Sequence, residues 1–327
     1  MSRILVFGAG GVGCIYALIL WKAGAEVTTV CRSNYEQISE HGVTVRSKKW
    51  GTCLVRPNAV RTVEEAAQSG PFDYVFVCSK AFPNTAKLIR EAVGPETVIV
   101  LAQNGMGIEA EYSVAYANNT IISGVVYLPT TQVEPGVIEH GTPLERFEVG
   151  TYPANSGESA KAAVTTLVDL FAKGDGTCVS YDDIQGQRWY KLALNAAFNP
   201  ITALTLCDDA NFLRSSEGAL AMVKDIMREV GTVAKTYGYD IIDETSIAQQ
   251  TARHEERMFT GGKEPSMLVD VRHERPVEVE AILGNVVRLA KVKKVEVPFL
   301  SVLYTLTKAR NFSIMKDGAW KPIARVN

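Results

Sequence analysis

Residues 4–13 read ILVFGAGGVG, a short apolar run that leads into glycines at positions 8, 10 and 13. Apolar residues then recur at helical spacing as far as Lys22. A strand, a G-x-G-x-x-G turn and a helix in this order form the usual binding site for the pyrophosphate of a dinucleotide, at the helix N-terminus. In such a turn the first glycine permits the tight bend, the second admits the pyrophosphate and the third lets the helix pack on the strand. We therefore predict cofactor contacts from Gly8, Ala9, Gly10, Gly11, Val12 and Gly13.

Short apolar runs alternate with helical stretches through the first hundred residues. Further buried strands are predicted at Glu26–Cys31, Tyr74–Cys78 and Val98–Ala102, with a small hairpin formed by Val43–Arg46 and Thr52–Val55. Strands that are apolar on both sides belong to a sheet covered on both faces, and their alternation with helices makes the sheet parallel. The fold class predicted here is an α/β, Rossmann-type doubly wound domain.

The pattern changes beyond the first hundred residues. Thr120–Gln132 and Val137–Glu139 flank a Glu-Pro-Gly turn that predicts antiparallel strands, and Val179–Ser180 reads as a last strand. From residue 184 onward apolar residues recur at helical spacing in five stretches: Gln187–Ala197, Ser216–Tyr237, Ile242–Met258, Val277–Ala290 and Pro298–Ala309. We therefore predict a Rossmann domain at residues 1–183 and an all-α domain at residues 184–327.

The composition is that of an ordinary globular protein. Hydrophobic residues make up 46% of the 327 residues, and the net charge is −2. Without a basic excess we expect no nucleic-acid or membrane partner. The N-terminus shows no signal-peptide pattern, and the six cysteines form no C-x-x-C pair, so a cytoplasmic location is expected. The four histidines lack ligand spacing, and we predict no metal site.

The end of the second strand indicates which dinucleotide is used. An NAD site usually has an acid there to bind the ribose 2′-hydroxyl, whereas an arginine accommodates the 2′-phosphate of NADP. Here the strand is followed by Arg32, Ser33 and Asn34. We predict that the cofactor is NADP(H), that Arg32 binds its 2′-phosphate and that Ser33 or Asn34 adds hydrogen bonds. The alternative is that Arg32 is an exposed arginine that binds no ligand.

Polar residues follow two later strands at the edge where this fold binds ligands. Lys80 follows one strand, and Asn104 follows the next within the segment Asn-Gly-Met-Gly. The ordinary alternative is that Lys80 is simply exposed to solvent. Because polar residues follow two strands at the same edge of the sheet, a cofactor or substrate role is favoured for both Lys80 and Asn104.

The helical half carries a second polar constellation. Lys191, Asn195 and Asn199 are four residues apart and share one face of a helix. Farther on, Ser266 precedes Glu278, which stands just after Pro276 and is expected in the first turn of a helix. From these residues alone, two alternatives remain. The face with Lys191, Asn195 and Asn199 can be an ordinary solvent-exposed one, and Glu278 can merely complement the helix dipole.

Taken together, these segments resemble the ketopantoate reductase (2-dehydropantoate 2-reductase) family over roughly the whole chain. The N-terminal glycine motif, the Asn-Gly-Met-Gly segment, W-x-K-L-x-x-N-x-x-x-N-P-x-T-A-L and S-M-x-x-D…E-x-x-x-I-x-G occur in family order. The resemblance implies that Lys191 is the general acid and Glu278 orients the substrate. It also implies substrate contacts from Asn195, Asn199 and Ser266, a place for Asn104 near the nicotinamide, and NADPH contacts from Arg32 and Lys80.

The implied reaction is NADPH-dependent reduction of the ketone of 2-dehydropantoate, a small 2-keto acid, to pantoate. Two departures put the substrate in question. Phe82-Pro83 replaces a cofactor-contacting glutamine of the family, and Asn211 is an uncertain match for a further substrate-side asparagine. Two alternative functions stay open: a relative that reduces another 2-keto acid, a diketone or an imine, and an NADP(H)-sensing protein without turnover. A homodimer is a possible assembly.

Overall fold

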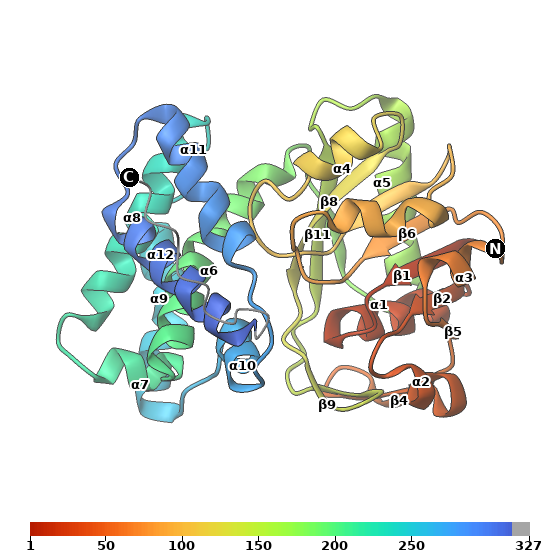
Figure 1. Cartoon of the computed structure of the whole chain (residues 1–327), viewed down its shortest axis with the longest axis horizontal. Coiled ribbons are helices and arrows are strands. Elements are labelled where there is room, and N and C mark those ends of the chain that lie inside the picture. Colours follow the sequence, from red (N-terminus) through yellow and green to blue (C-terminus); the bar gives the residue numbers. More distant parts are fainter. Residues whose placement is uncertain (316–327) are drawn as a thin grey trace, which may run out of the picture. The chain divides into compact units, whose positions relative to one another are not determined.

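The computed structural model describes residues 1–315. Its contacts divide the chain into two compact units, one spanning Met1–Gln187 and one beginning at Arg188 (Figure 1). The division falls inside helix α6 (Ile184–Thr205), a few residues beyond the boundary predicted after residue 183. Residues 316–327 of the predicted second domain lie outside the described residues.

An eight-stranded sheet forms the framework of the first unit. Its strand order is β12-β11-β8-β7-β6-β1-β2-β5, and neighbours are parallel except β8 and β11, which run antiparallel. The strands are β1 (Arg3–Phe7), β2 (Glu26–Val30), β5 (Asn58–Val60), β6 (Tyr74–Val77), β7 (Val98–Leu101), β8 (Ile121–Tyr127), β11 (Arg146–Tyr152) and β12 (Cys178–Ser180). The largely apolar central strands are buried, as expected for a sheet covered on both faces. The predicted α/β fold class is confirmed.

A second sheet of four strands has the order β4-β3-β10-β9. The strands are β3 (Val43–Ser47), β4 (Gly51–Val55), β9 (Thr131–Glu134) and β10 (Val137–His140). The predicted hairpin is the antiparallel pair β3–β4, and the predicted turn joins antiparallel β9 and β10. The expectation of one strand over Thr120–Gln132 is wrong, because β8 and β9 divide that stretch between the two sheets.

Helix α1 (Gly11–Lys22) is buried along most of its length, with Cys14–Leu20 no more than 1% exposed. It contacts β1 and β2 of the large sheet and also β3, β4 and β10 of the small one. A helix covered on all sides is apolar all round, which explains its uniform run of large hydrophobic residues. The other helices of this unit are α2 (Tyr35–His41), α3 (Val63–Ala67), the 3₁₀ helix η1 (Thr85–Ala92), α4 (Ala110–Ala115) and α5 (Glu158–Lys173).

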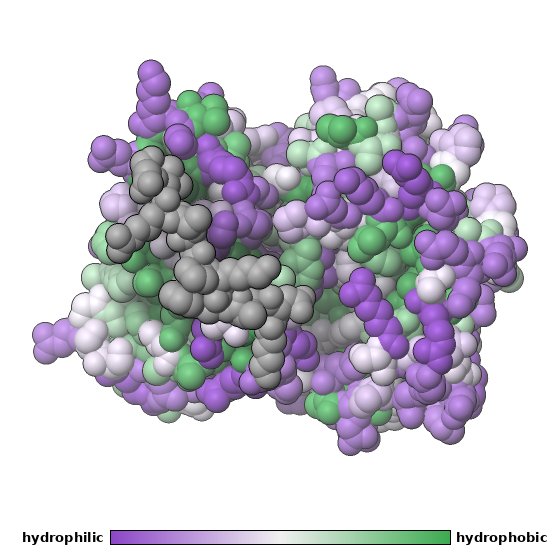
Figure 2. All heavy atoms as spheres, viewed as in Figure 1, coloured by the Kyte–Doolittle hydropathy of each residue, from purple (hydrophilic) through white to green (hydrophobic). Residues whose placement is uncertain are grey.

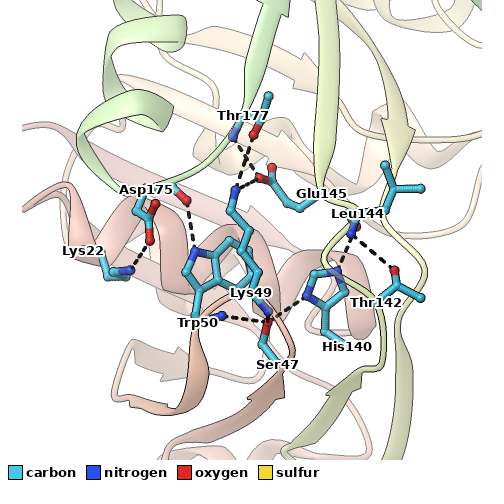
Figure 3. Close-up of polar contacts among 10 residues, drawn as sticks. All are labelled: Lys22, Ser47, Lys49, Trp50, His140, Thr142, Leu144, Glu145, Asp175 and Thr177. Atoms are coloured by element: carbon cyan, nitrogen blue, oxygen red, sulfur yellow. Dashed lines mark hydrogen bonds and ion pairs between the residues drawn. The ribbon is translucent and has the colours of Figure 1, made fainter.

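A polar cluster links the small sheet to the segment before β11 and to the loop before β12 (Figure 3). The ammonium of Lys49 lies 2.7 Å from the fully buried carboxylate of Glu145. His140 accepts a hydrogen bond from Ser47 at Nδ1 (2.9 Å) and donates from Nε2 to the Leu144 carbonyl (2.8 Å), because a carbonyl can only accept. These contacts are internal to the scaffold, so the one fully buried histidine is structural.

The secondary-structure elements of the second unit are all helices within its described residues. After α6 come α7 (Asp209–Arg214), α8 (Ala219–Thr236), α9 (Glu244–Thr260), α10 (Ser266–Arg272), the π-helical turn η2 (Glu280–Gly284), α11 (Asn285–Lys293) and α12 (Pro298–Ile314). Helix α6 continues through Pro200, past the end predicted at Ala197. None of the helices formed by residues 1–315 is long and apolar enough to cross a membrane. Hydrophilic side chains are spread over the visible faces of both units (Figure 2).

Candidate functional site

The glycine-rich turn between β1 and α1 is shaped by close backbone packing. Gly8 has a φ of 108°, and a Cβ on it would lie 2.6 Å from the backbone nitrogen of Ser79. A Cβ on Gly13 would run into the carbonyl oxygen of Gly8. By contrast, a Cβ on Gly10 would meet nothing within 4 Å. Two glycines are therefore required by the fold, while the third leaves open space in front of the helix N-terminus, which suits a pyrophosphate.

Asn34 holds this turn from the side. Its Nδ2 donates to the carbonyl of Ala9 at 2.6 Å, and the side chain is 5% exposed. The thiol of Cys14 lies 3.3 Å from the same oxygen. One N–H of the Asn34 amide is thus engaged in the turn, and its predicted hydrogen bond to a 2′-phosphate stays a prediction. Ser33 is exposed, and its predicted hydrogen bond stays a prediction.

Arg32 is exposed just beyond the end of β2. Its guanidinium forms no ion pair or hydrogen bond with another residue in the described part of the chain. An arginine in this position, beside the open glycine turn, fits the place where a 2′-phosphate lies in dinucleotide-binding folds. The residues present thus fit NADP(H): the turn would hold the pyrophosphate, and Arg32 would hold the 2′-phosphate.

Lys80 and Asn104 follow β6 and β7, which lie next to each other and to β1 in the sheet. Both side chains are half-buried. Their backbone is fixed by Gln103, whose Nε2 donates to the Ser79 carbonyl at 2.9 Å. At the Phe82-Pro83 departure, the Phe82 N–H donates to the Lys80 carbonyl at 3.0 Å, and the chain turns into η1. Parallel strands present their carboxyl ends at one edge, so the cofactor residues predicted from the sequence come from the same edge of the sheet.

In the helical unit, α6 carries Lys191, Asn195 and Asn199 on one face. Asn199 is 6% exposed, and the other two side chains are half-buried. This is not the freely exposed polar face that the sequence left open. Partly buried amides and an ammonium are costly to desolvate unless they are hydrogen-bonded, and the binding and catalytic roles of these residues stay predictions.

Ser266 and Glu278 lie on other elements of the same unit. Ser266 is the first residue of α10, a helix that the sequence analysis did not predict. Glu278 precedes the helical turn rather than lying in it, since the helix begins at Val279. The backbone N–H of Val277 donates to Oδ1 of Asn311 at 2.9 Å, which holds the segment outside the helix. The helix thus begins at Val279 rather than at Pro276, but the Glu278 carbonyl accepts its first hydrogen bond, from the N–H of Ile282 at 3.0 Å. Glu278 therefore stands at the helix N-terminus, and the helix-dipole alternative stays open.

Asp209, which the sequence analysis passed over, is the centre of a buried ionic cluster. Its Oδ2 accepts hydrogen bonds from His254 Nδ1 (2.8 Å) and Arg257 (2.6 Å), and its Oδ1 accepts one from the N–H of Lys263 (2.6 Å). Burial by itself would raise the pKa of Asp209, but these hydrogen bonds outweigh it and lower the pKa to about 2. The ring of His254 stacks on Phe198 of α6 at 4.2 Å. The cluster thus ties α7, α9 and the segment before Ser266 to the helix that carries Lys191.

Asn211 makes only local contacts. It is exposed, its amide donates to Asp208 Oδ2 at 2.8 Å, and its carbonyl oxygen accepts from Arg214 at 2.7 Å. These contacts weaken its tentative match to a substrate-side asparagine. Within residues 1–315 no group of three or more His, Cys, Asp or Glu side chains is arranged to hold a metal ion.

Comparison with known proteins covers both units. The family profile described as ketopantoate reductase PanE/ApbA matches residues 4–154, and the profile of its C-terminal region matches residues 183–311. An uncharacterized protein from Saccharomyces cerevisiae is 33% identical, covering 94% of this chain and 92% of its own length. A 2-dehydropantoate 2-reductase from Nostoc is 28% identical, with 92% and 93% covered.

Solved structures show the same architecture. The crystal structure of 2-dehydropantoate 2-reductase from Methylococcus capsulatus aligns with a TM-score of 0.82 at 33% identity, covering 96% of this chain and 98% of that one. A D-mandelate dehydrogenase bound to NADH and anilino(oxo)acetate shares the fold, with a TM-score of 0.82 at 21% identity and coverage of 95% and 99%. Since family profiles match most of the chain and a relative is one-third identical over nearly all of it, the chain belongs to the ketopantoate reductase family of oxidoreductases.

Proposed function

We propose that this protein reduces the ketone of 2-dehydropantoate to pantoate with NADPH. The observation that carries the proposal is the partly buried face of α6, where Lys191 stands in line with Asn195 and Asn199. This helix lies within the part of the chain that matches the C-terminal family profile. The relatives support membership of the family, whereas the identity of the substrate is our inference.

In the proposed mechanism, NADPH when bound supplies the hydride that attacks the carbonyl carbon. Lys191 provides the proton: as the C=O π bond breaks, negative charge develops on oxygen, and the ammonium first stabilises this charge and then transfers a proton to form the hydroxyl. The neutral amine afterwards regains a proton from water. The net change is one hydride and one proton added to the ketone.

The remaining residues bind and orient the substrate. Asn195, Asn199 and Ser266 offer neutral donors that can hold a carboxylate without adding a full charge, and Glu278 can accept a hydrogen bond from the substrate hydroxyl. Asn104 is assigned to the nicotinamide side. A group that orients a reactant contributes to kcat as well as to KM, because a small misplacement of the reacting atoms slows the reaction.

NADPH is the proposed cofactor because Arg32 has no competing partner among the described residues and follows β2, at whose end dinucleotide-binding folds accommodate a 2′-phosphate. Losing a charge-assisted contact of this kind weakens binding by roughly ten- to a hundredfold. Arg32→Ala should therefore reduce the affinity for NADPH by that factor and leave NADH little changed. Isothermal titration with both cofactors tests the assignment, and an equal loss for both would remove it.

Two alternatives share the fold. One is a relative that reduces a different 2-keto acid, a diketone or an imine, and the neighbouring D-mandelate dehydrogenase fold makes an aromatic 2-keto acid a sensible comparison. The other is an NADP(H)-sensing protein without turnover. NADPH oxidation followed by absorbance should depend on added ketopantoate. Turnover only with another ketone supports the first alternative, and tight NADPH binding without any turnover supports the second.

We further propose a cytoplasmic location and a homodimer. All six cysteines are free thiols, as in proteins of a reducing compartment. Light scattering on the purified protein should give about twice the chain mass, and a monomeric mass at micromolar concentration would exclude the dimer.

A further inference from the structure

A second arginine stands beside Arg32 at the carboxyl ends of β2 and β5. These strands pair in parallel, with Val30 opposite Val60. The N–H of Cys31 donates to the carbonyl of Val60 at 2.8 Å, and the N–H of Arg61 donates to a carboxylate oxygen of Glu65, also at 2.8 Å. Arg32 and Arg61 therefore leave the sheet at neighbouring positions on a fixed backbone.

Arg61, unlike Arg32, is held by its neighbours. Its guanidinium lies 4.0 Å from the centre of the Tyr35 ring and donates to the carboxylate of Glu36. Both partners belong to α2, which packs beside β5 (Figure 1). The hydrogen bond from Arg61 lowers the pKa of Glu36, so this carboxylate is ionised at neutral pH.

Glu36 is an acid near the end of β2 that the sequence analysis did not count. An acid in this region favours NAD, because it accepts a hydrogen bond from the ribose 2′-hydroxyl and repels a 2′-phosphate. Its presence conflicts with an NADPH site unless the charge is compensated. Arg61 supplies that compensation.

We propose that Arg61 is a second determinant of 2′-phosphate recognition, acting by pairing with Glu36 and so compensating its charge beside Arg32. Without Arg61, Glu36 would be free to accept the ribose hydroxyl of NADH and to repel NADPH. The inference rests on the proposed use of NADPH and goes beyond it, since it assigns the selectivity to three residues rather than one.

The test is a double-mutant cycle read by isothermal titration with NADPH, NADH and adenosine 2′,5′-bisphosphate. Arg61→Ala should weaken NADPH and the bisphosphate by about three- to tenfold, as expected for an exposed and salt-screened charge contact, without weakening NADH. Glu36→Gln should leave NADPH as tight or tighter. The double variant should regain most of the affinity for NADPH, because the uncompensated acid is gone.

Arg46→Ala is the matched control. Arg46 forms a similar exposed ion pair with Glu139 at 3.1 Å, but on the small sheet. Its loss should change neither cofactor affinity nor melting temperature. The inference is overturned if Arg61→Ala leaves the ratio of NADPH to NADH affinity unchanged, or if the double variant binds NADPH as weakly as Arg61→Ala. A wild-type protein without preference for NADPH would instead overturn the cofactor assignment together with this inference.

Discussion

The glycine turn and the polar face of the helical unit achieve their geometry in opposite ways. Residues 8–13 are contiguous, and close backbone contacts require glycine at positions 8 and 13, while Gly10 leaves open space. Lys191, Ser266 and Glu278 come from three elements separated by many residues, and the ionic cluster around Asp209 joins some of those elements. A cofactor turn can thus be encoded locally, whereas the proposed catalytic face exists only when the helices pack.

The largest expected effect tests the helical side of this comparison. Lys191→Ala should lower kcat by about 10²–10⁴-fold, because no other group would supply the proton, while NADPH still binds. Stopped-flow measurement of NADPH oxidation with ketopantoate, together with titration of NADPH, checks both parts. Lys235→Ala, which removes an exposed lysine of α8, is the control and should behave as wild type. Near-normal kcat in Lys191→Ala would remove the lysine from the mechanism.

Asp209→Asn should destabilise the protein by about 2–3 kcal/mol, since it leaves Arg257 and His254 without their buried anion. Asp225→Asn removes an exposed ion pair with Arg228 and should cost less than about 1 kcal/mol. Urea unfolding of the two variants gives the comparison. Equal losses would mean that the cluster contributes no more than a surface pair.

The same carboxylate predicts an acid dependence. Its pKa is lowered from 3.8 to about 2 in the folded protein, so its contribution is complete above pH 3.8 and is lost as the pH falls toward 2. The gap corresponds to about 2 kcal/mol at about 1.4 kcal/mol per pH unit. The stability difference between wild type and Asp209→Asn should therefore shrink between pH 4 and pH 2. A difference that stays constant over this range would contradict the assignment.

Gly13→Ala and Gly10→Ala separate fold from binding within one turn. The added methyl at Gly13 meets the Gly8 carbonyl and should destabilise the protein by about 1–3 kcal/mol, despite the better helix propensity of alanine. At Gly10 the methyl enters open space, so stability should stay within about 0.5 kcal/mol while NADPH binding weakens. Thermal unfolding and titration distinguish the two. A stable Gly13→Ala protein would show that the turn can relax.

The smallest expected effect concerns Glu278. Its replacement by alanine should raise KM for ketopantoate about tenfold and lower kcat as well, because binding and orientation are lost together. Glu280 is unsuitable as a control, since its carboxylate accepts hydrogen bonds from Arg288 and Tyr304. The exposed Glu217 serves instead, and Glu217→Ala should leave both constants unchanged. A change in KM without any change in kcat would leave Glu278 a binding role alone.

Most of the strand pattern of the large sheet could be read from the sequence, because buried strands are short runs of apolar residues. The parallel pairing of β3 with β10 could not, since it joins residues almost a hundred positions apart and leaves no local signal. The exact start of the helix after Pro276 was missed for a similar reason. Pro276 suits a helix start, but the N–H of Val277 donates to Asn311, on a distant helix, and the helix begins only at Val279.

By itself the sequence determined the strand–turn–helix that fits a dinucleotide and the spacing that puts Lys191, Asn195 and Asn199 on one face, because backbone sterics and helical periodicity act within a few residues. Only the tertiary structure decided that Asn34 holds the turn, that Arg61 pairs with Glu36 beside Arg32, and that Asp209 anchors the helices around α6. Each of these depends on a polar side chain whose partner is chosen by packing. A hydrogen bond of this kind has no sequence period, so it becomes visible only when the folded chain brings the two groups together.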